Sequence, residues 1–325
     1  MDLAAPANRS HIKETTMNTT TESWSGRAAL MVAHCAGMVD LVALPVWVGV
    51  LISGYGMDPQ QAGGLATLFL VGAVTGSLLI APRSARIPVR STATAGFAIA
   101  AMAFGAVGLV ENYAVMALLH VAAGLAAATA LSVTHATIGC SNNPHRLFAI
   151  VGFGLGVFGI VFMAGVPKMI GAAGAPALFW IFAAIMAFAA CVAALCFPQA
   201  RSTMPVARLA RDRLPREVWR AGIGISCMAL VQAMMFAFVE RIGADRGYGA
   251  AAVAGVLIAL GFVNLIPGPL AALLQKRINP RTVLVCGPIV QAMLALLMTQ
   301  SRSFVPYAAG AMVFAAVMIF THTFA

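Results

Sequence analysis

The chain has 325 residues, of which 61% are apolar and only 9% are charged, and its mean hydropathy is +0.92. Soluble domains carry about 25% charged residues, so this composition excludes a water-soluble globular protein. The apolar runs are about 20 residues long and do not alternate with polar residues, which indicates membrane-spanning helices and not strands. The net charge of +10 does not indicate a nucleic-acid partner, because the basic residues lie almost entirely in short loops. We therefore expect an all-α polytopic membrane protein whose main partner is the lipid bilayer.

The chain order divides into a tail, a first bundle, a linker and a second bundle. The polar residues 1–26 predict a disordered tail. Six apolar segments within 27–197 predict a six-helix bundle, and a basic linker at 198–220 follows. Four more segments in 221–325 predict an incomplete second bundle. The ten segments are 28–52, 61–81, 92–110, 114–139, 147–167, 176–197, 221–241, 250–274, 282–300 and 305–325.

The loops alternate in charge. The N-terminal tail and every second loop carry 16 of the 20 Lys and Arg residues, and the loops between them carry the other four. Basic loops stay in the cytoplasm, so this alternation predicts a cytoplasmic N-terminus and a cytoplasmic linker. We expect a multi-pass protein of the cytoplasmic (inner) membrane of a bacterium.

One pattern occurs twice. Gly-Tyr-Gly at 54–56 returns at 247–249, and an Arg-flanked loop at 86–90 returns at 277–281, with offsets of 193 and 191 residues. Both copies begin on one side of the membrane and end in a basic loop on the other, so the repeat is parallel. A period of about 192 residues spans six helices, and two such halves need about 12 helices. We therefore expect the last two helices to be missing from this sequence.

Six helices, a basic linker and a parallel repeat resemble the major facilitator superfamily over residues 28–325. Its motif in the loop after the second helix reads Gly-x3-Asp-Arg-x-Gly-x-Arg. Arg86 and Arg90 match this motif, but Ala85 stands at the Asp position, and Lys276 stands there in the second copy. The resemblance implies cytoplasmic gate loops, and contact with anionic lipid is the alternative role. The gate residues are then Arg86, Arg90, Arg277 and Arg281.

Asp40 is the strongest candidate for chemistry. It lies about 13 residues into the first segment, which is roughly 20 Å from the start at 1.5 Å per residue and thus near the membrane midplane. A charge at that depth is costly and indicates function, although a hydrogen bond to a neighbouring helix is the alternative. A carboxyl group that is neutral when excluded from water and ionised when hydrated is suited to carrying a proton. We predict that Asp40 couples transport to the proton gradient.

Further polar and aromatic residues fall on the helices that the resemblance assigns to a central cavity, namely the first, fourth, seventh and tenth. Trp47 shares the helical face of Asp40, and the repeat offset relates Asp40 to Gln232. The predicted substrate-cavity residues are Trp47, His120, His135, Gln232 and His322. Other polar residues inside predicted helices are His34, Asn264 and Gln291.

Two features near helix ends complete the pattern. Glu240 and Arg241 end the seventh segment beside Asp245, which indicates either a solvated surface cluster or an outer gate. Residues 264–269 contain two prolines and predict a local break in the eighth helix.

The six cysteines lie in or at the ends of apolar segments without metal-type spacing, so we expect neither disulfides nor a metal site.

No motif in the sequence indicates an enzyme. A nucleotide-binding loop is also missing, so we expect no cofactor and an ion gradient as the energy source. The leading interpretation is a monomeric, proton-coupled transporter that exports a small organic molecule by alternating access. Because the cavity helices lack buried Arg or Lys, neutral, aromatic or cationic substrates are favoured. Two alternatives stay open: a ten-helix drug/metabolite-type exporter, whose inverted repeat would need an offset near 150 residues, and a truncated chain that does not transport.

Overall fold

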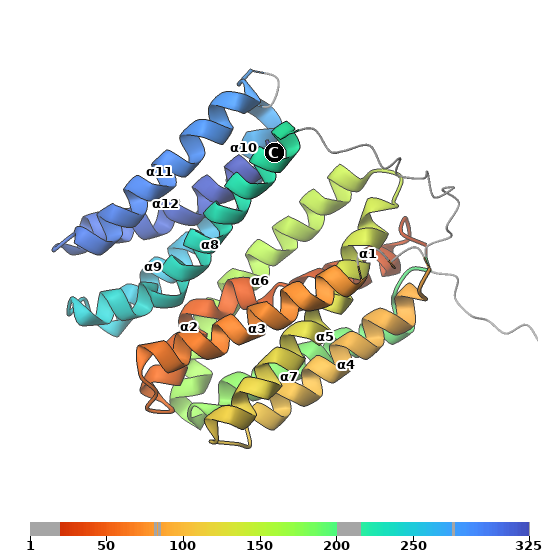
Figure 1. Ribbon diagram of the computed structural model, residues 1–325, viewed down its shortest axis with the longest axis horizontal. Helices are drawn as coiled ribbons and strands as arrows, with labels where there is room; N and C mark the ends of the chain where they lie inside the picture. Colours follow the sequence, from red (N-terminus) through yellow and green to blue (C-terminus); the bar gives the residue numbers. More distant parts are fainter. Residues whose placement is uncertain (1–19, 81–82, 84–85, 200–215, 275–276, 325) are drawn as a thin grey trace, which may run out of the picture.

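The computed structural model describes residues 20–80, 83, 86–199, 216–274 and 277–324, and these residues form helices and connecting turns without any strand (Figure 1). The helices are α1 (Trp24–Gly37), α2 (Val39–Ser53), α3 (Pro59–Ile80), α4 (Val89–Val107), α5 (Tyr113–Gly139), α6 (Pro144–Ala173), α7 (Pro176–Cys196), α8 (Arg216–Asp245), α9 (Ala250–Val263), α10 (Pro267–Leu274), α11 (Pro280–Gln300) and α12 (Phe304–His322).

Ten membrane crossings result, because α1 and α2 form one broken span and α9 and α10 form another. Within the described residues, nine spans are long and apolar enough to cross a bilayer. The tenth span is α4, a 19-residue helix that packs against α5 and α7. This confirms the predicted all-α fold with ten crossings. A helix is favoured here because each backbone N–H and C=O must find a partner inside the bilayer. Side chains cap several helix starts: the side-chain oxygens of Ser23, Asn112 and Asn143 accept backbone N–H bonds.

Three differences from the predicted boundaries bear on the domain limits and on the candidate site. The cap at Ser23 starts α1 at Trp24, so the end of the predicted disordered tail is helical, whereas residues 1–19 lie outside the described part of the chain. α8 begins at Arg216, inside the predicted linker, and residues 200–215 are not described. The first span breaks at Met38, which the sequence did not predict, whereas the predicted break in the eighth span lies between Val263 and Pro267.

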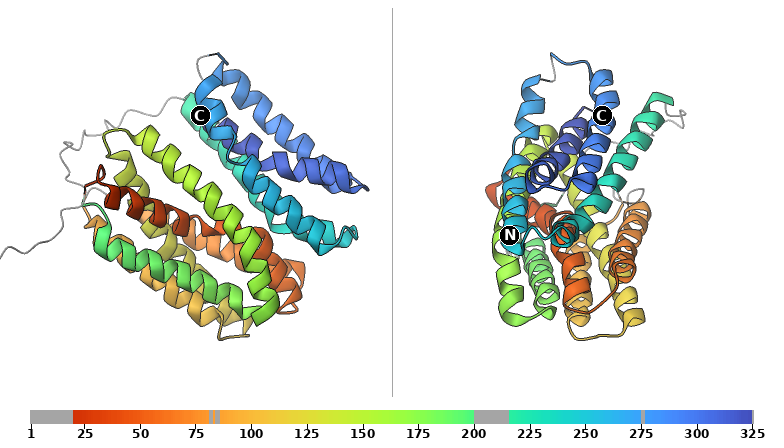
Figure 2. Two further views of the ribbon diagram at one scale, coloured as in Figure 1. Left: turned by 180° about the vertical axis from the view of Figure 1, so that it is seen from behind. Right: turned by 90° about the vertical axis from the view of Figure 1, so that its left-hand side faces the viewer.

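The helices form two bundles, α1–α7 and α8–α12, which diverge toward the ends of α7 and α8 that the linker joins (Figures 1 and 2). This side is named the linker side, and the opposite side the far side. In the first bundle α5 packs against α3 and α4. In the second, α12 packs in the same way against α9, α10 and α11. The offset of about 192 residues relates these sets of helices, so both halves of the repeat share one packing pattern.

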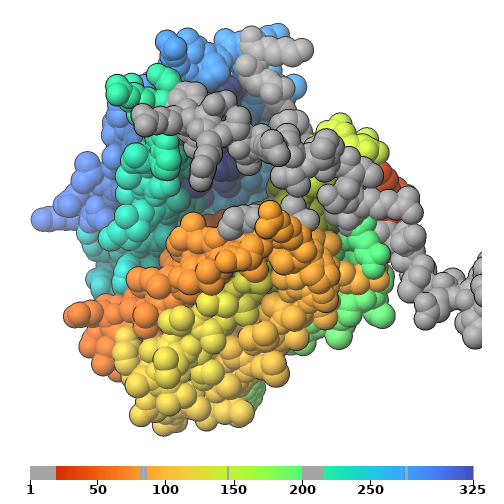
Figure 3. Space-filling view, turned by 45° about the vertical axis from the view of Figure 1, so that its right-hand side comes forward, coloured from red at the N-terminus to blue at the C-terminus, as the bar shows by residue number. Residues whose placement is uncertain are grey.

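The two bundles meet on the far side and at mid-depth. α2 packs against α8, and α6 packs against α9. Gly63 of α3 faces Phe238 of α8, and Gly156 of α6 faces Leu265 beside α9. Figure 3 shows the bundles as two lobes, with the teal α8 lying against the orange α3 at their junction.

Glycines allow α3 and α5 to approach backbone to backbone. A β-carbon at Gly124 would overlap the carbonyl oxygen of Phe69, and one at Gly72 would overlap that of Val121. Small residues at such positions are typical of helix pairs in membranes, where close contact replaces the hydrophobic effect as the driving force.

We expect Gly124→Ala to destabilise the first bundle, because α3 and α5 would have to separate. Overpacking of this kind costs about 1–3 kcal/mol. Thermal unfolding of the purified protein in detergent measures the loss. Gly139→Ala, on the same helix, is the matched control because its β-carbon would meet nothing within 4 Å. Equal unfolding midpoints for both variants would contradict the close approach of α3 and α5.

Candidate functional site: a cavity between the bundles

A cavity of about 360 Å³ lies between the two bundles and is lined by residues of α2, α3, α6, α8, α9 and α12. This volume lies at the lower end of the range for small-molecule sites, which is about 300–1,000 Å³. Most of its lining is apolar. The polar groups are Asp40, Gln232, Asn264 and the indole of Trp47, and Asp40 is the only ionisable residue among the described lining residues.

The break in the first span positions Asp40. The N–H of Met38 bonds to the carbonyl of His34 at 3.0 Å and closes α1, and α2 begins at the next residue. Asp40 therefore lies in the first turn of α2. The free amides of a helix N-terminus favour a negative charge, so this position stabilises the carboxylate whenever water reaches the cavity.

The second broken span reaches the same cavity. Asn264 follows the last residue of α9, and its side-chain oxygen is buried without a hydrogen-bond partner among the described residues. One discontinuous helix from each bundle thus presents polar groups to the cavity. Breaks of this kind at mid-membrane depth are typical of substrate and ion sites in transporters.

The side chain of Gln232 is fixed by Gln291, which does not line the cavity. The side-chain amide of Gln291 on α11 donates to the Gln232 carbonyl oxygen at 3.3 Å and to the backbone oxygen of Met228 at 3.2 Å. The amide nitrogen of Gln232 has no hydrogen-bond acceptor within the described part of the chain, so it is available to a molecule in the cavity.

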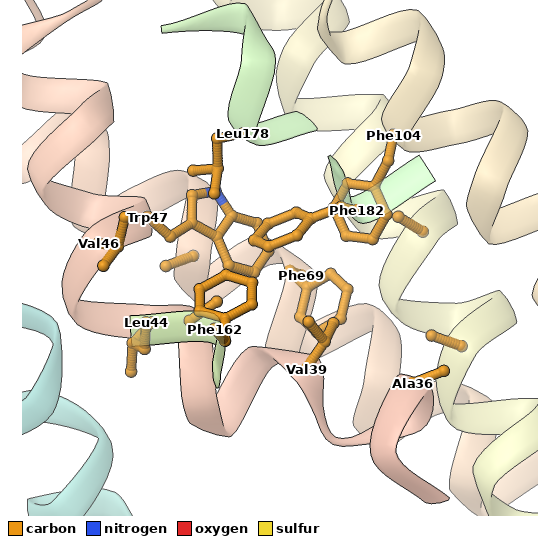
Figure 4. Packing of buried hydrophobic residues seen from close by; sticks show 14 of the residues in the cluster. Ala36, Val39, Leu44, Val46, Trp47, Phe69, Phe104, Phe162, Leu178 and Phe182 are labelled. Carbon is orange, nitrogen blue, oxygen red and sulfur yellow. The ribbon is translucent and has the colours of Figure 1, made fainter. Parts of the chain in front are cut away.

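Trp47 lines the cavity. It is also the centre of an aromatic cluster (Figure 4). It is fully buried, with ring-centroid distances of 5.2 Å to Phe69, 5.7 Å to Phe104 and 5.1 Å to Phe182. His120 stacks on it at 5.4 Å. The indole is thus both a wall of the cavity and the core of the first bundle.

The three histidines predicted for the cavity lie elsewhere. His120 is fully buried behind Trp47, and its Nδ1 donates to the Met116 carbonyl at 2.6 Å. His135 on α5 bonds to His34 on α1 through Nε2 and Nδ1 at 3.0 Å. His322 is exposed at the end of α12. None of the three lines the cavity.

The structure therefore brings together Asp40, Trp47 and Gln232, and adds Asn264. The sequence named Asn264 only as one of several buried polar residues. The prolines that follow Asn264 are the sequence feature that points to it. They break the span, and a break exposes polar side chains and free backbone groups to the cavity. The pair of His34 and His135 had no sequence signal, since it depends on the register between α1 and α5.

The four predicted gate arginines lie on the linker side. Arg86, Arg277 and Arg281 are exposed. The Nε of Arg90 donates to the carbonyl of Phe197 at 2.9 Å and so ties the start of α4 to the end of α7. Two of the arginines belong to each bundle. The two residues at the Asp position of the motif, 85 and 276, fall outside the described residues.

Comparison with known proteins identifies the fold. The sequence matches the family model of the Major Facilitator Superfamily over residues 29–325. No curated protein sequence matches it. Among solved structures, it is similar to the nucleoside transporter NupG (TM-score 0.68, 12% identity, 92% of this chain and 80% of that chain). It is also similar to the D-xylose-proton symporter (TM-score 0.64, 13% identity, 93% and 80%).

A third similar structure is a bacterial homolog of the human lysosomal transporter Spinster, in an inward-facing and unoccupied conformation. Its TM-score is 0.63 at 15% identity, over 91% of this chain and 72% of that chain. Identities this low show a shared fold and no more. The family match excludes the ten-helix drug/metabolite-type alternative, because it covers both halves of the parallel repeat. The chain is a multi-pass membrane protein that belongs to the major facilitator superfamily.

Proposed function

We propose that this protein is a secondary active transporter that exports a small organic molecule in exchange for protons by alternating access. The observation that carries the proposal is the position of Asp40, a half-buried carboxyl at a helix break on the cavity between the bundles. We propose further that the linker side faces the cytoplasm of a bacterium and that the protein acts as a monomer in the inner membrane. The charge distribution of the loops supports this orientation.

The position of Asp40 supports an exchange mechanism. An ionised carboxylate without a partner is unfavourable in an apolar, water-free cavity, and is favourable when the cavity is hydrated. A substrate cation neutralises the carboxylate, and so does a proton. The two therefore compete for one group, and the bundles close around either of them. Competition of this kind produces antiport without any contact between proton and substrate.

The lining supports a weakly polar or cationic substrate. Beside Asp40, the polar groups of the cavity are two side-chain amides and one indole, whereas the other lining residues are apolar. A sugar or nucleoside needs many hydrogen bonds, and each one left unmade in a buried site costs affinity. An aromatic cation satisfies the carboxylate and fills the apolar space.

Everted membrane vesicles test this proposal with ethidium, an aromatic cation, as the probe. We expect vesicles that contain the protein to accumulate ethidium when a pH gradient is imposed, and to release it when nigericin collapses the gradient. Uptake equal to that of vesicles without the protein, or uptake unaffected by nigericin, would refute proton-coupled export.

A further inference from the structure

A second carboxyl group lies between the bundles, away from the cavity. Glu240 is on α8, five residues before the helix ends on the far side, and it is half-buried. Its neighbour Arg241 is exposed and already pairs with Asp245 at 2.9 Å. Within the described part of the chain, Glu240 has neither an ion-pair partner nor a hydrogen-bond donor.

The carboxyl group of Glu240 lies against the backbone of α2 at Gly49. A β-carbon at Gly49 would lie 2.8 Å from Oε2 and 3.2 Å from Cδ of Glu240. Gly49 thus leaves the space that this carboxyl group occupies, and any other residue there would fill it. The contact joins the two bundles, because α2 belongs to the first and α8 to the second.

Glu240 continues the cavity face of α8. Gln232 and Phe236 line the cavity, and Glu240 follows at the same spacing of four residues, so all three lie on one face of the helix. Gly49 lies nine residues beyond Asp40 along α2, which corresponds to roughly 13 Å at 1.5 Å per residue. The two carboxyl groups therefore occupy separate positions along one interface.

Few of the described groups near Glu240 are able to compensate a negative charge on its carboxyl group. Tyr307 of α12 is close enough to interact with it electrostatically, but the Tyr307 hydroxyl donates to the Val239 carbonyl at 2.7 Å. The Tyr248 hydroxyl is buried near Tyr307 and has no partner among the described residues. On α2, Gly49 faces this carboxyl group and has no side chain, and the only titratable residue of α2 is Asp40. An ionised carboxylate in this contact is thus uncompensated.

We propose that Glu240 is a second proton-binding site, and that α8 closes on α2 at the far side only when Glu240 is protonated. A neutral carboxyl group fits against Gly49 without the cost of burying an unpaired charge. When α2 and α8 separate, water reaches the carboxylate and the proton leaves. Acidification then favours the closed far side. The inference rests on the proposed function in one respect, since it requires the bundles to move against each other.

Distances between two spin labels on the far side test this inference. Labels are attached at Gln60→Cys in the first bundle and Ala244→Cys in the second, in a background that lacks the six native cysteines and elutes like the native protein. We expect acidification to shift the wild-type distance distribution toward short values. Glu240→Gln mimics the protonated group, so its distribution should stay short at neutral and acidic pH.

Two further variants make the outcome decisive. Gly49→Ala forces the carboxyl group away from α2, so we expect long distances even at acidic pH. Asp245→Asn, which removes an exposed carboxylate from the same helix, should keep the wild-type response. A pH response that persists in Glu240→Gln, or a wild-type distribution that does not respond to pH, would overturn the inference. These distances do not depend on ethidium transport, so failure of the proposed function would be seen separately in the vesicle assay.

Discussion

Vesicles that carry the Asp40→Asn variant are expected to lose pH-gradient-driven ethidium uptake, down to the level of vesicles without the protein. Asparagine keeps the size and polarity of the side chain but cannot bind or release a proton. It also cannot neutralise a cation in a cavity whose other described polar groups are all neutral. Asp40→Asn therefore abolishes both proton binding and neutralisation of the substrate cation, which makes this the largest expected effect on activity.

Two controls separate charge from structure in this experiment. Asp40→Glu retains a carboxyl group at the start of α2 and should keep part of the uptake. Asp245→Asn removes a carboxylate that is exposed and lies outside the cavity, so uptake should be unchanged. Gradient-driven uptake by Asp40→Asn at the wild-type rate would show that the proton is carried elsewhere.

Trp47→Ala is expected to cause the largest loss of stability, about 3–5 kcal/mol, which is the usual range for removing a large aromatic side chain from a core. The indole is fully buried and contacts aromatic rings from four other helices of the first bundle. Its removal would leave a void that these rigid neighbours cannot fill. The void would join the substrate cavity, so the variant should also bind ethidium more weakly.

Thermal unfolding in detergent measures this loss. Trp47→Phe keeps an aromatic ring in the cluster and should lose much less. Trp219→Ala is the matched control, because Trp219 is 61% exposed on α8 and its removal leaves no internal void. Equal unfolding midpoints for Trp47→Ala and Trp219→Ala would show that the aromatic cluster does not support the bundle.

The crossings were predictable because a helix is the only way for an apolar run of this length to satisfy its backbone in lipid. The break after Val263 was also predictable, since Pro267 cannot donate to the helix ladder. The break at Met38 was not. Its one signal is Gly37, whose missing β-carbon makes room for Leu131 of α5. That contact depends on how α1 and α5 pack, which the sequence of either helix alone does not specify.

The cavity was predictable in part. The repeat related Asp40 to Gln232, and both line the cavity. The family resemblance places the histidines on cavity helices, but the helix on which a residue lies does not specify whether its side chain faces the cavity. His120 turns toward Trp47 inside the first bundle, and His135 turns toward His34. His322 ends α12, so its side chain lies at the surface, beyond the cavity residues Met318 and Ile319.

Proton movement driven by substrate tests the central claim most directly. Purified protein is reconstituted into liposomes that contain a pH-sensitive dye, and ethidium is added outside without any imposed gradient. Exchange predicts that the lumen becomes alkaline as ethidium enters, and that Asp40→Asn shows no such change. Ethidium entry without a change in lumenal pH, or an undiminished pH change in Asp40→Asn, would contradict proton exchange through Asp40.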